Sequence, residues 1–238
     1  MSVRSQLTPS VDSSLGMKML PSVLSMIAGS ADVIGFLGLG GLFIAHITGN
    51  LILVAAHIVS GTGVKPAHLL SVPVFIAVLG LTRLLVARLE AAGLASLRPL
   101  LLLQLLLLTG FLTFCVAAGP SVSPDKVMTI VAGMLGVSAM AVQNAMVVMS
   151  LKDSPSTAVM TTNITRFVMD VGEVLLRNDP DKVAEARRRA WHTFPAIIGF
   201  SCGAGLGAAC FVVAGLWSLM LPTTLALLAF LLCRCRRV

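Results

Sequence analysis

Ionisable and amide side chains occur inside two otherwise apolar stretches of the sequence, Ile44–Ser60 and Val159–Leu176. In the first stretch, His46, Asn50 and His57 are separated by four and seven residues, so on an α-helix they share one face within about 40°. Such side chains can take up a proton, or bind an ion or a polar solute. The first stretch therefore predicts a short polar helix that carries a candidate binding face.

The second stretch has a comparable face. Asn163 and Asp170 are seven residues apart, and Arg166 lies about 60° away around the helix. Arg166 and Asp170 are also spaced i,i+4, so the two charges could neutralise each other. A charge at the centre of a bilayer costs roughly 2.5–3.5 kcal/mol. Both polar helices are therefore expected to face protein, water or the membrane interface rather than lipid.

The two polar stretches correspond at an offset of 113 residues. Thr48-Gly49-Asn50 aligns with Thr161-Thr162-Asn163, and His57 aligns with Asp170. This correspondence predicts a two-fold internal repeat. The predicted organisation is an N-terminal tail at 1–16, a first membrane repeat at 17–119, a linker at 120–124 and a second membrane repeat at 125–238.

Each polar stretch follows an apolar segment that contains a polar residue, Asp32 in the first half and Gln143-Asn144 in the second. Asp32 could serve as a proton or cation site, or alternatively as a helix cap or a partner for an arginine. We expect a midplane site where the two polar helices meet, with the helix starts offering N–H groups to an anion. The alternative is that these groups only join helix to helix by hydrogen bonds. The predicted substrate-binding residues are Asp32, His46, Thr48, Asn50, His57, Asn144, Thr161, Asn163 and Asp170.

The composition is that of a membrane protein. The 238 residues are 57% hydrophobic and only 11% charged, where soluble domains carry about 25% charged residues. The apolar residues form blocks of about 20, the length that crosses a hydrocarbon core as a helix. We predict an all-α polytopic membrane protein with two short polar helices and six apolar transmembrane helices, at 19–39, 69–89, 99–119, 127–149, 193–215 and 217–233.

The distribution of basic residues predicts the topology. If only the six apolar blocks cross, the basic residues of both termini, Arg88, Arg98 and the segment from Lys152 to Arg189 lie on one side, which is cytoplasmic by the positive-inside rule. Each half then crosses three times, so the repeat is inverted and each polar helix re-enters from its own side. Eight crossings remain an alternative because Ile44–Ser60 is long enough to span. The basic run at 187–189 is expected to contact anionic lipid headgroups.

Several classes of function lack support in the sequence. There is no nucleophile, phosphate-loop or zinc-protease motif, and no Cys, His or carboxylate set has metal-site spacing. We therefore expect neither an enzyme nor a metal or other cofactor. The net charge of +7 is spread over many loops and does not predict a nucleic-acid partner. The leading hypothesis is a small secondary transporter or exporter of a small molecule or ion; the alternative is a scaffold, lipid-binding or accessory membrane protein. Self-association is left open.

The segment from Ala28 to Asp32, followed by Phe36-Leu37-Gly38 and by Phe43 to Asn50 (FIAHITGN), resembles the signature of the YoaK-like membrane proteins, also called domain of unknown function 1275. The second half is similar from Gln143-Asn144-Ala145 to Asn163, and the resemblance extends from about residue 20 to 233. Thr162 lies at a position where the second repeat of the YoaK-like proteins often has glycine. The resemblance implies a bacterial protein of the inner (plasma) membrane and implies no activity.

Overall fold

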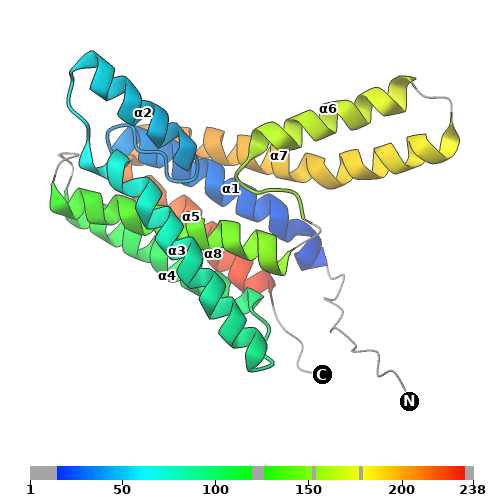
Figure 1. The fold of residues 1–238 in the computed structure, drawn as a ribbon, viewed down its shortest axis with the longest axis horizontal. Coiled ribbons are helices and arrows are strands. Elements are labelled where there is room, and N and C mark those ends of the chain that lie inside the picture. The colour runs from blue at the N-terminus through cyan, green and yellow to red at the C-terminus, as the bar shows by residue number, and fades with distance from the viewer. Residues whose placement is uncertain (1–14, 120–125, 152–153, 177–178, 234–238) are drawn as a thin grey trace.

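The computed structural model describes residues 15–119, 126–151, 154–176 and 179–233. These residues form α-helices and one 3-10 helix, and none of them lies in a strand (Figure 1). The elements are α1 (Leu15–Gly38), α2 (Ile47–Ser60), α3 (Pro66–Ala91), α4 (Leu97–Ala117), α5 (Val127–Ser150), α6 (Met160–Leu176), α7 (Pro180–Ala214), η1 (Gly215–Leu219) and α8 (Met220–Leu232).

Among the described residues, five segments are long and apolar enough to cross a membrane. Four of them correspond to α1, α3, α4 and α5, and the fifth, Pro180–Leu232, comprises α7, η1 and α8. Within the fifth segment the chain turns at Gly215, whose φ of 56° favours glycine. The all-helical prediction is confirmed, and the long apolar helices are those of a multi-pass membrane protein.

The predicted helix positions agree with the structure except at α7 and at the span predicted for 217–233, which is divided between η1 and the 13-residue helix α8. The two polar helices begin at Ile47 and Met160, within a few residues of the predicted starts. The span predicted at 193–215 is part of a longer helix that begins at Pro180, because Asp179 caps the helix by accepting a hydrogen bond from the Asp181 N–H. The predicted tail, apart from residues 15 and 16 in α1, and the predicted linker fall outside the described residues.

Helix α1 lies at the centre of the molecule, packed against α7, α8 and α5. Glycines of α7 allow its closest contacts with α1: a Cβ at Gly199 would lie 2.5 Å from the Ser22 carbonyl oxygen, and one at Gly203 would lie 2.3 Å from that of Met26. The numbering rises together along both helices, so α1 and α7 run parallel. Small residues at such positions let membrane helices approach closely.

Contacts between helix ends define two ends of the bundle. At one end, Ser96 before α4 bonds Ser150 at the end of α5 (2.8 Å), and Arg98 lies 5.2 Å from the ring centroid of Phe230 in α8. At the other end, Lys65 before α3 donates to the carbonyl oxygen of Gly40, just after α1. The end that holds Arg98 is also the end at which α1 begins.

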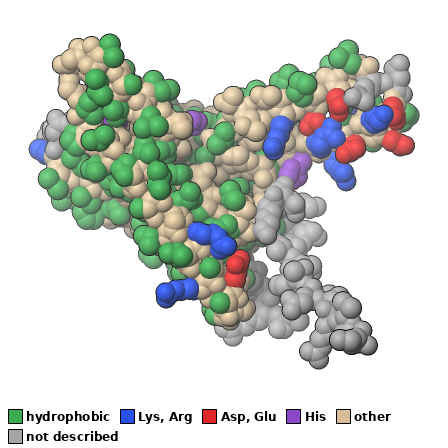
Figure 2. Space-filling view, in the orientation of Figure 1, with side chains coloured by type: hydrophobic (Ala, Val, Ile, Leu, Met, Phe, Trp, Pro, Cys, Tyr) green, Lys and Arg blue, Asp and Glu red, His purple; other side chains and the backbone are tan. Residues whose placement is uncertain are grey.

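Helices α2 and α6 lie outside this packed body. Helix α2 packs on α3, whereas α6 packs on α7. In Figure 1 the two helices diverge from starts near the middle of the molecule, and α6 with the first part of α7 forms a projecting arm. Figure 2 shows hydrophobic side chains over much of the body, and charged side chains on the arm and at the lower tip of the body.

Candidate functional site

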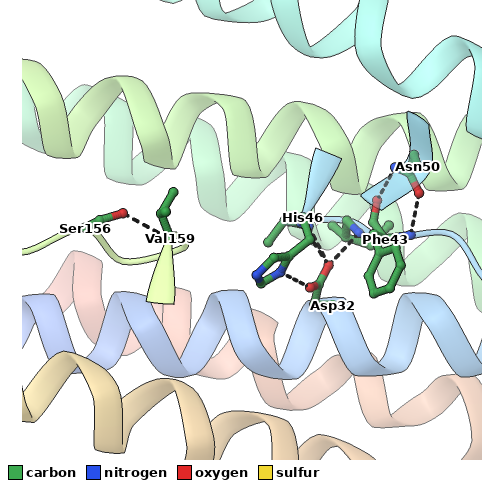
Figure 3. Close-up of polar contacts among 8 residues, drawn as sticks. Asp32, Phe43, His46, Asn50, Ser156 and Val159 are labelled. Atoms are coloured by element: carbon green, nitrogen blue, oxygen red, sulfur yellow. Dashed lines mark hydrogen bonds and ion pairs between the residues drawn. The ribbon is translucent and has the colours of Figure 1, made fainter. Parts of the chain in front are cut away.

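Asp32 holds the start of α2 (Figure 3). Its Oδ1 accepts hydrogen bonds from the backbone N–H groups of Ile44 (2.8 Å), Ala45 (2.7 Å) and His46 (3.3 Å). Its Oδ2 contacts Nδ1 of the His46 ring. The residue is only 5% exposed, although it lies within a membrane-length helix. A buried carboxylate is stable here because both of its oxygens are satisfied.

These contacts correct one expectation about α2. The first turn of a helix presents unpaired N–H groups, and the sequence predicted that these groups would bind an anionic ligand. The carboxylate of Asp32 binds the N–H groups of the loop residues directly before that turn. A carboxylate of the protein therefore already lies beside the start of α2, and the chemistry that Asp32 and His46 favour is that of a proton or a cation.

The Asp32–His46 pair borders a cavity of about 310 Å³. The side chain of His46 is 39% exposed, against 6% for that of Asp32. Because the carboxylate accepts at Nδ1, the neutral ring carries its hydrogen there and keeps Nε2 as an acceptor for a further proton. The remaining wall is apolar and aromatic, and the lining residues are Asp32, Val33, Phe36, Leu37, Phe43, His46 and Phe200.

Aromatic rings surround the imidazole of His46. Its ring centroid lies 5.6 Å from that of Phe200 and 6.3 Å from that of Phe43, and both pairs meet edge to face. Phe200 belongs to α7, so the cavity lies between α1, the start of α2 and the middle of α7. The sequence did not predict Phe200, because one phenylalanine in a membrane helix carries no local sign of which neighbour it will face.

Asn50 stabilises the loop that precedes α2 by two hydrogen bonds. Its Oδ1 accepts from the Phe43 N–H (2.9 Å), and its Nδ2 donates to the Phe43 carbonyl oxygen (2.8 Å). Asn50 is fully buried by these contacts, so it positions the loop and does not line the cavity. Gly49 allows the same loop to pass closely, since a Cβ there would lie 2.8 Å from the Phe43 ring.

The start of α6 has a related arrangement. Asn163 donates from Nδ2 to the carbonyl oxygen of Ser156 (2.6 Å), and Ser156 Oγ accepts from the Val159 N–H (3.0 Å). Both asparagines therefore reach back seven residues, and Ser156 stands 113 positions after Phe43. In Figure 3 the two helix starts appear above the same central helix.

A buried amide network joins the start of α6 to three helices. Nε2 of Gln143 donates to the Leu24 carbonyl oxygen and to Thr157 Oγ1, both at 2.9 Å, and Gln104 donates to Gln143 Oε1 at 2.6 Å. Gln143, Gln104 and Thr157 are at most 1% exposed. The sequence prediction did not include Gln104 or Thr157. The signal for Gln104 was its isolation within a run of leucines, because a lone amide in such a span needs a partner.

Several predicted binding residues lie apart from the cavity. Asn144 donates to the Met140 carbonyl oxygen of its own helix (2.9 Å), and His57 contacts the Leu53 carbonyl oxygen of its own helix (2.6 Å). Thr48 and Thr161 are exposed, and their side chains bond to no other described residue. The structure therefore brings only Asp32 and His46 of the predicted set to the cavity, with Asn50 directly behind it.

Asp170 has a different partner from the one that its spacing suggested. The Arg189 guanidinium reaches it from α7 (Nε to Oδ1, 2.8 Å) and also contacts Glu173 (2.7 Å) and Glu185 (3.2 Å). Asp170, which is 8% exposed, thus ties α6 to α7. Helix α2 packs on α3 and α6 packs on α7, and Asp170 lines a different cavity from the one that Asp32 and His46 line.

The described residues hold no group of three or more His, Cys, Asp or Glu side chains able to bind a metal ion together. Asp32 and His46 form a pair that lacks a third ligand of that kind. The arrangement is suited to binding a proton, or a cation that contacts aromatic rings, within a membrane-length bundle.

Comparison with known proteins identifies a family. The family described as "Protein of unknown function (DUF1275)" matches residues 20–232, and it is the family that the FIAHITGN segment resembled. No curated protein and no solved structure matches the chain. The match covers the body and the arm, and the chain belongs to the DUF1275 family of proteins of unknown function.

Proposed function

We propose that the protein is a small secondary transporter that exchanges protons for a small organic cation, one with an aromatic or apolar group, at the Asp32–His46 cavity. The observation that carries this proposal is a buried carboxylate, within a membrane-length helix, in contact with a histidine that is 39% exposed and borders a cavity. Ionisable groups at membrane depth are costly and mark ion or substrate pathways by default.

The charge of the pair supports proton exchange. Asp32 with neutral His46 carries one negative charge, and uptake of a proton at Nε2 makes the pair neutral. A monovalent cation in the cavity compensates the same negative charge. Proton and cation therefore compete for one charge, which is the requirement for exchange.

The wall of the cavity supports the class of solute. Phe36, Phe43 and Phe200 line the space beside His46. Aromatic faces attract cations by about 0.5–2 kcal/mol, most strongly where water is excluded. An anion would meet the Asp32 carboxylate, and a strongly hydrated ion would have few polar groups to replace its water. The cavity thus favours an organic cation.

The proposed topology has six crossings, by α1, α3, α4, α5, the apolar part of α7, and α8. Helices α2 and α6 begin at membrane depth and run out to opposite ends, as halves of an inverted repeat. Support comes from the matched asparagine bonds of Asn50 and Asn163, which lie 113 residues apart. By the positive-inside rule, the end that holds Arg98, the start of α1 and the end of α8 is cytoplasmic. The resemblance to the YoaK-like proteins supports a bacterial inner membrane.

Transport can be measured with purified protein in liposomes that are acidic inside and contain a pH-sensitive dye. We expect external N-ethylpyridinium to drive proton release in wild type. Asp32→Asn and His46→Gln should each lower this flux about tenfold or more, because each removes one member of the pair. His57→Gln is the matched control, since His57 hydrogen-bonds to its own helix and does not line the cavity, and its flux should equal that of wild type.

Two results would overturn the proposal. One is the absence of cation-dependent proton flux in wild type when the protein is folded in the liposomes; this result would favour a scaffold or accessory role. The other is unchanged flux in both Asp32→Asn and His46→Gln, which would place the exchange elsewhere. Toluenesulfonate, an aromatic anion, serves as the charge control and should release no protons.

A further inference from the structure

A second cavity lies on the projecting arm, defined as α6 together with residues 180–194 of α7. Its volume is about 590 Å³, almost twice that of the Asp32–His46 cavity. The proposed transport cycle does not use it. Residues from both helices of the arm line it: Thr165, Arg166, Met169, Asp170, Arg188, Arg189, His192 and Thr193.

The charge of this cavity is positive. Three arginines line it against one acid, Asp170, which gives a net charge of +2 with His192 neutral. Arg189 is engaged by Asp170 and by two glutamates. Within the part of the chain that the structure describes, Arg166 and Arg188 have no ion-pair partner, and both are exposed. Two guanidinium groups on facing helices are therefore available to a ligand.

The Asp170–Arg189 ion pair joins the two helices that carry these groups. It joins α6 to α7 at 2.8 Å. Arg166 lies one turn before Asp170 on α6, and Arg188 directly precedes Arg189 on α7. The two free arginines thus flank a bonded contact and enter the cavity from opposite walls, an arrangement suited to an oxyanion with several acceptor oxygens.

The position of the cavity along the bundle indicates the level of lipid headgroups. Gly199 of α7 lies against Ser22 of α1, and the two helices run parallel. Arg188 lies about 16 Å before Gly199 along α7, whereas the membrane-length segment of α1 begins at Met19, about 4 Å before Ser22. Arg188 is thus about 12 Å beyond the start of that segment, outside the hydrocarbon core and on the side of the lipid headgroups.

Another part of the arm is suited to the membrane interface. Phe167 stacks on Phe194 with ring centroids 5.4 Å apart, and Trp191 packs edge-on against Phe194 at 5.9 Å. Trp191 is nevertheless 67% exposed. These aromatic residues and Arg187 line a separate apolar cavity of about 310 Å³. Tryptophan at this level is typical of interfacial anchors.

We propose that the arm binds a phosphate group between Arg166 and Arg188, and that the phosphate belongs to an anionic phospholipid of the cytoplasmic leaflet. The shared chemistry is a phosphate oxyanion held by two guanidinium groups. A lipid source is favoured by the level of the cavity and by the neighbouring aromatic residues. The same cavity could receive a soluble phosphate, so the test separates the two sources.

The test measures thermal stabilisation of the full-length, delipidated protein in a nonionic detergent. The probes are dioleoylphosphatidylglycerol, dioleoylphosphatidylcholine, glycerol phosphate and inorganic phosphate. We expect the first to stabilise wild type, because a ligand of the folded state raises the midpoint. The double variant Arg166→Gln/Arg188→Gln should bind it about tenfold more weakly, since it loses charge-assisted hydrogen bonds.

Lys182→Gln is the matched control, because Lys182 lines neither cavity of the arm and its loss removes a positive charge from the same arm. Its affinity for phosphatidylglycerol should stay within about twofold of wild type if the site and not the overall charge decides binding. Stabilisation by glycerol phosphate or inorganic phosphate alone, with the same arginine dependence, supports the phosphate site and assigns a soluble source. Equal responses of wild type and the double variant to every probe would overturn the proposal, provided that both proteins elute as one folded species.

Discussion

At the scale of single residues, Asp32 has two separable roles. It accepts three backbone hydrogen bonds that hold the start of α2, and it contacts His46 at the edge of the cavity. The first role needs an acceptor oxygen, whereas the second needs a negative charge. We therefore expect Asp32→Asn, which keeps an acceptor oxygen, and Asp32→Ala, which does not, to differ in their effects on stability.

We expect Asp32→Asn to keep most of the stability of wild type, since its amide oxygen can still accept from the loop. Asp32→Ala should lower stability by roughly 2–5 kcal/mol, because it leaves buried N–H groups without an acceptor. Thermal unfolding in detergent, followed by the loss of monodisperse protein, measures both variants. If the Asp32→Ala variant is as stable as wild type, Asp32 does not hold the loop.

His68, unlike Asp32, is a buried polar residue whose side chain forms no hydrogen bond with another described residue. It is 1% exposed, and neither ring nitrogen forms a hydrogen bond with another described residue, although the Gly41 backbone lies close. The ring of His57 lies beside it, with centroids 5.6 Å apart. A buried polar group without a partner is costly.

His68→Leu, which is similar in volume, should therefore leave the unfolding midpoint unchanged or raise it. His46→Leu is the comparison, since it removes a contact that does exist, and it should lower the midpoint. A clear loss of stability in His68→Leu would mean that the ring has a partner beyond the described residues, such as water.

The sequence identified Asp32, His46 and Asn50 because a polar side chain inside an apolar stretch is locally conspicuous. It could not assign their roles. Asn50 faces its own loop and Asp170 faces Arg189, and both partners depend on how the chain folds back. Phe200 could not be predicted at all, because its role depends only on the proximity of α7 to α1.

At the scale of helices, the contact between α1 and α7 depends on glycine. Gly203 approaches the carbonyl group of Met26 so closely that any side chain would clash, whereas nothing lies within 4 Å of a Cβ at Gly205. Both glycines are in the same helix. The pair thus separates the effect of packing from that of helix propensity.

Gly203→Ala should destabilise the protein by about 1–3 kcal/mol or more, because it forces two helix backbones apart. Gly205→Ala should be neutral or slightly stabilising, since alanine is the better helix former. The predicted difference in stability can be measured from the yield and the unfolding temperature of the two variants in detergent. Similar behaviour of both would contradict the α1–α7 contact.

Helix α7 also shows where sequence patterns stop being informative. Hydropathy predicted its apolar part but not residues 180–192, whose charges resemble those of a loop. The cap at Asp179, followed by Pro180, starts the helix there, and ion pairs to α6 keep it in place. The capping signal is present in the sequence, but the ion-pair partners come from another helix.

At the scale of the whole molecule, six and eight crossings make different predictions for the ends of the two short helices. Val59 and Leu176 are both highly exposed, at 89% and 85%, near the ends of α2 and α6. With six crossings the two residues lie on opposite sides of the membrane. With eight crossings both lie on the cytoplasmic side.

Single cysteines at these positions, in a variant without the five native cysteines, can be labelled in intact cells with an impermeant maleimide. Val59→Cys should react from outside, and Leu176→Cys only after the membrane is permeabilised. Labelling of both from the same side would contradict the six-crossing inverted arrangement.

The most direct measurement for the central claim is proton release when a cation binds to the Asp32–His46 cavity. Purified protein in weakly buffered detergent is titrated with N-ethylpyridinium while a dye reports pH, at a starting pH near the ordinary pKa of histidine, about 6.5. Competition for one charge predicts release of up to about one proton per bound cation in wild type and none in His46→Gln. Binding of the cation without proton release, or equal release from the His46→Gln variant, would contradict the claim that this pair couples protons to a solute.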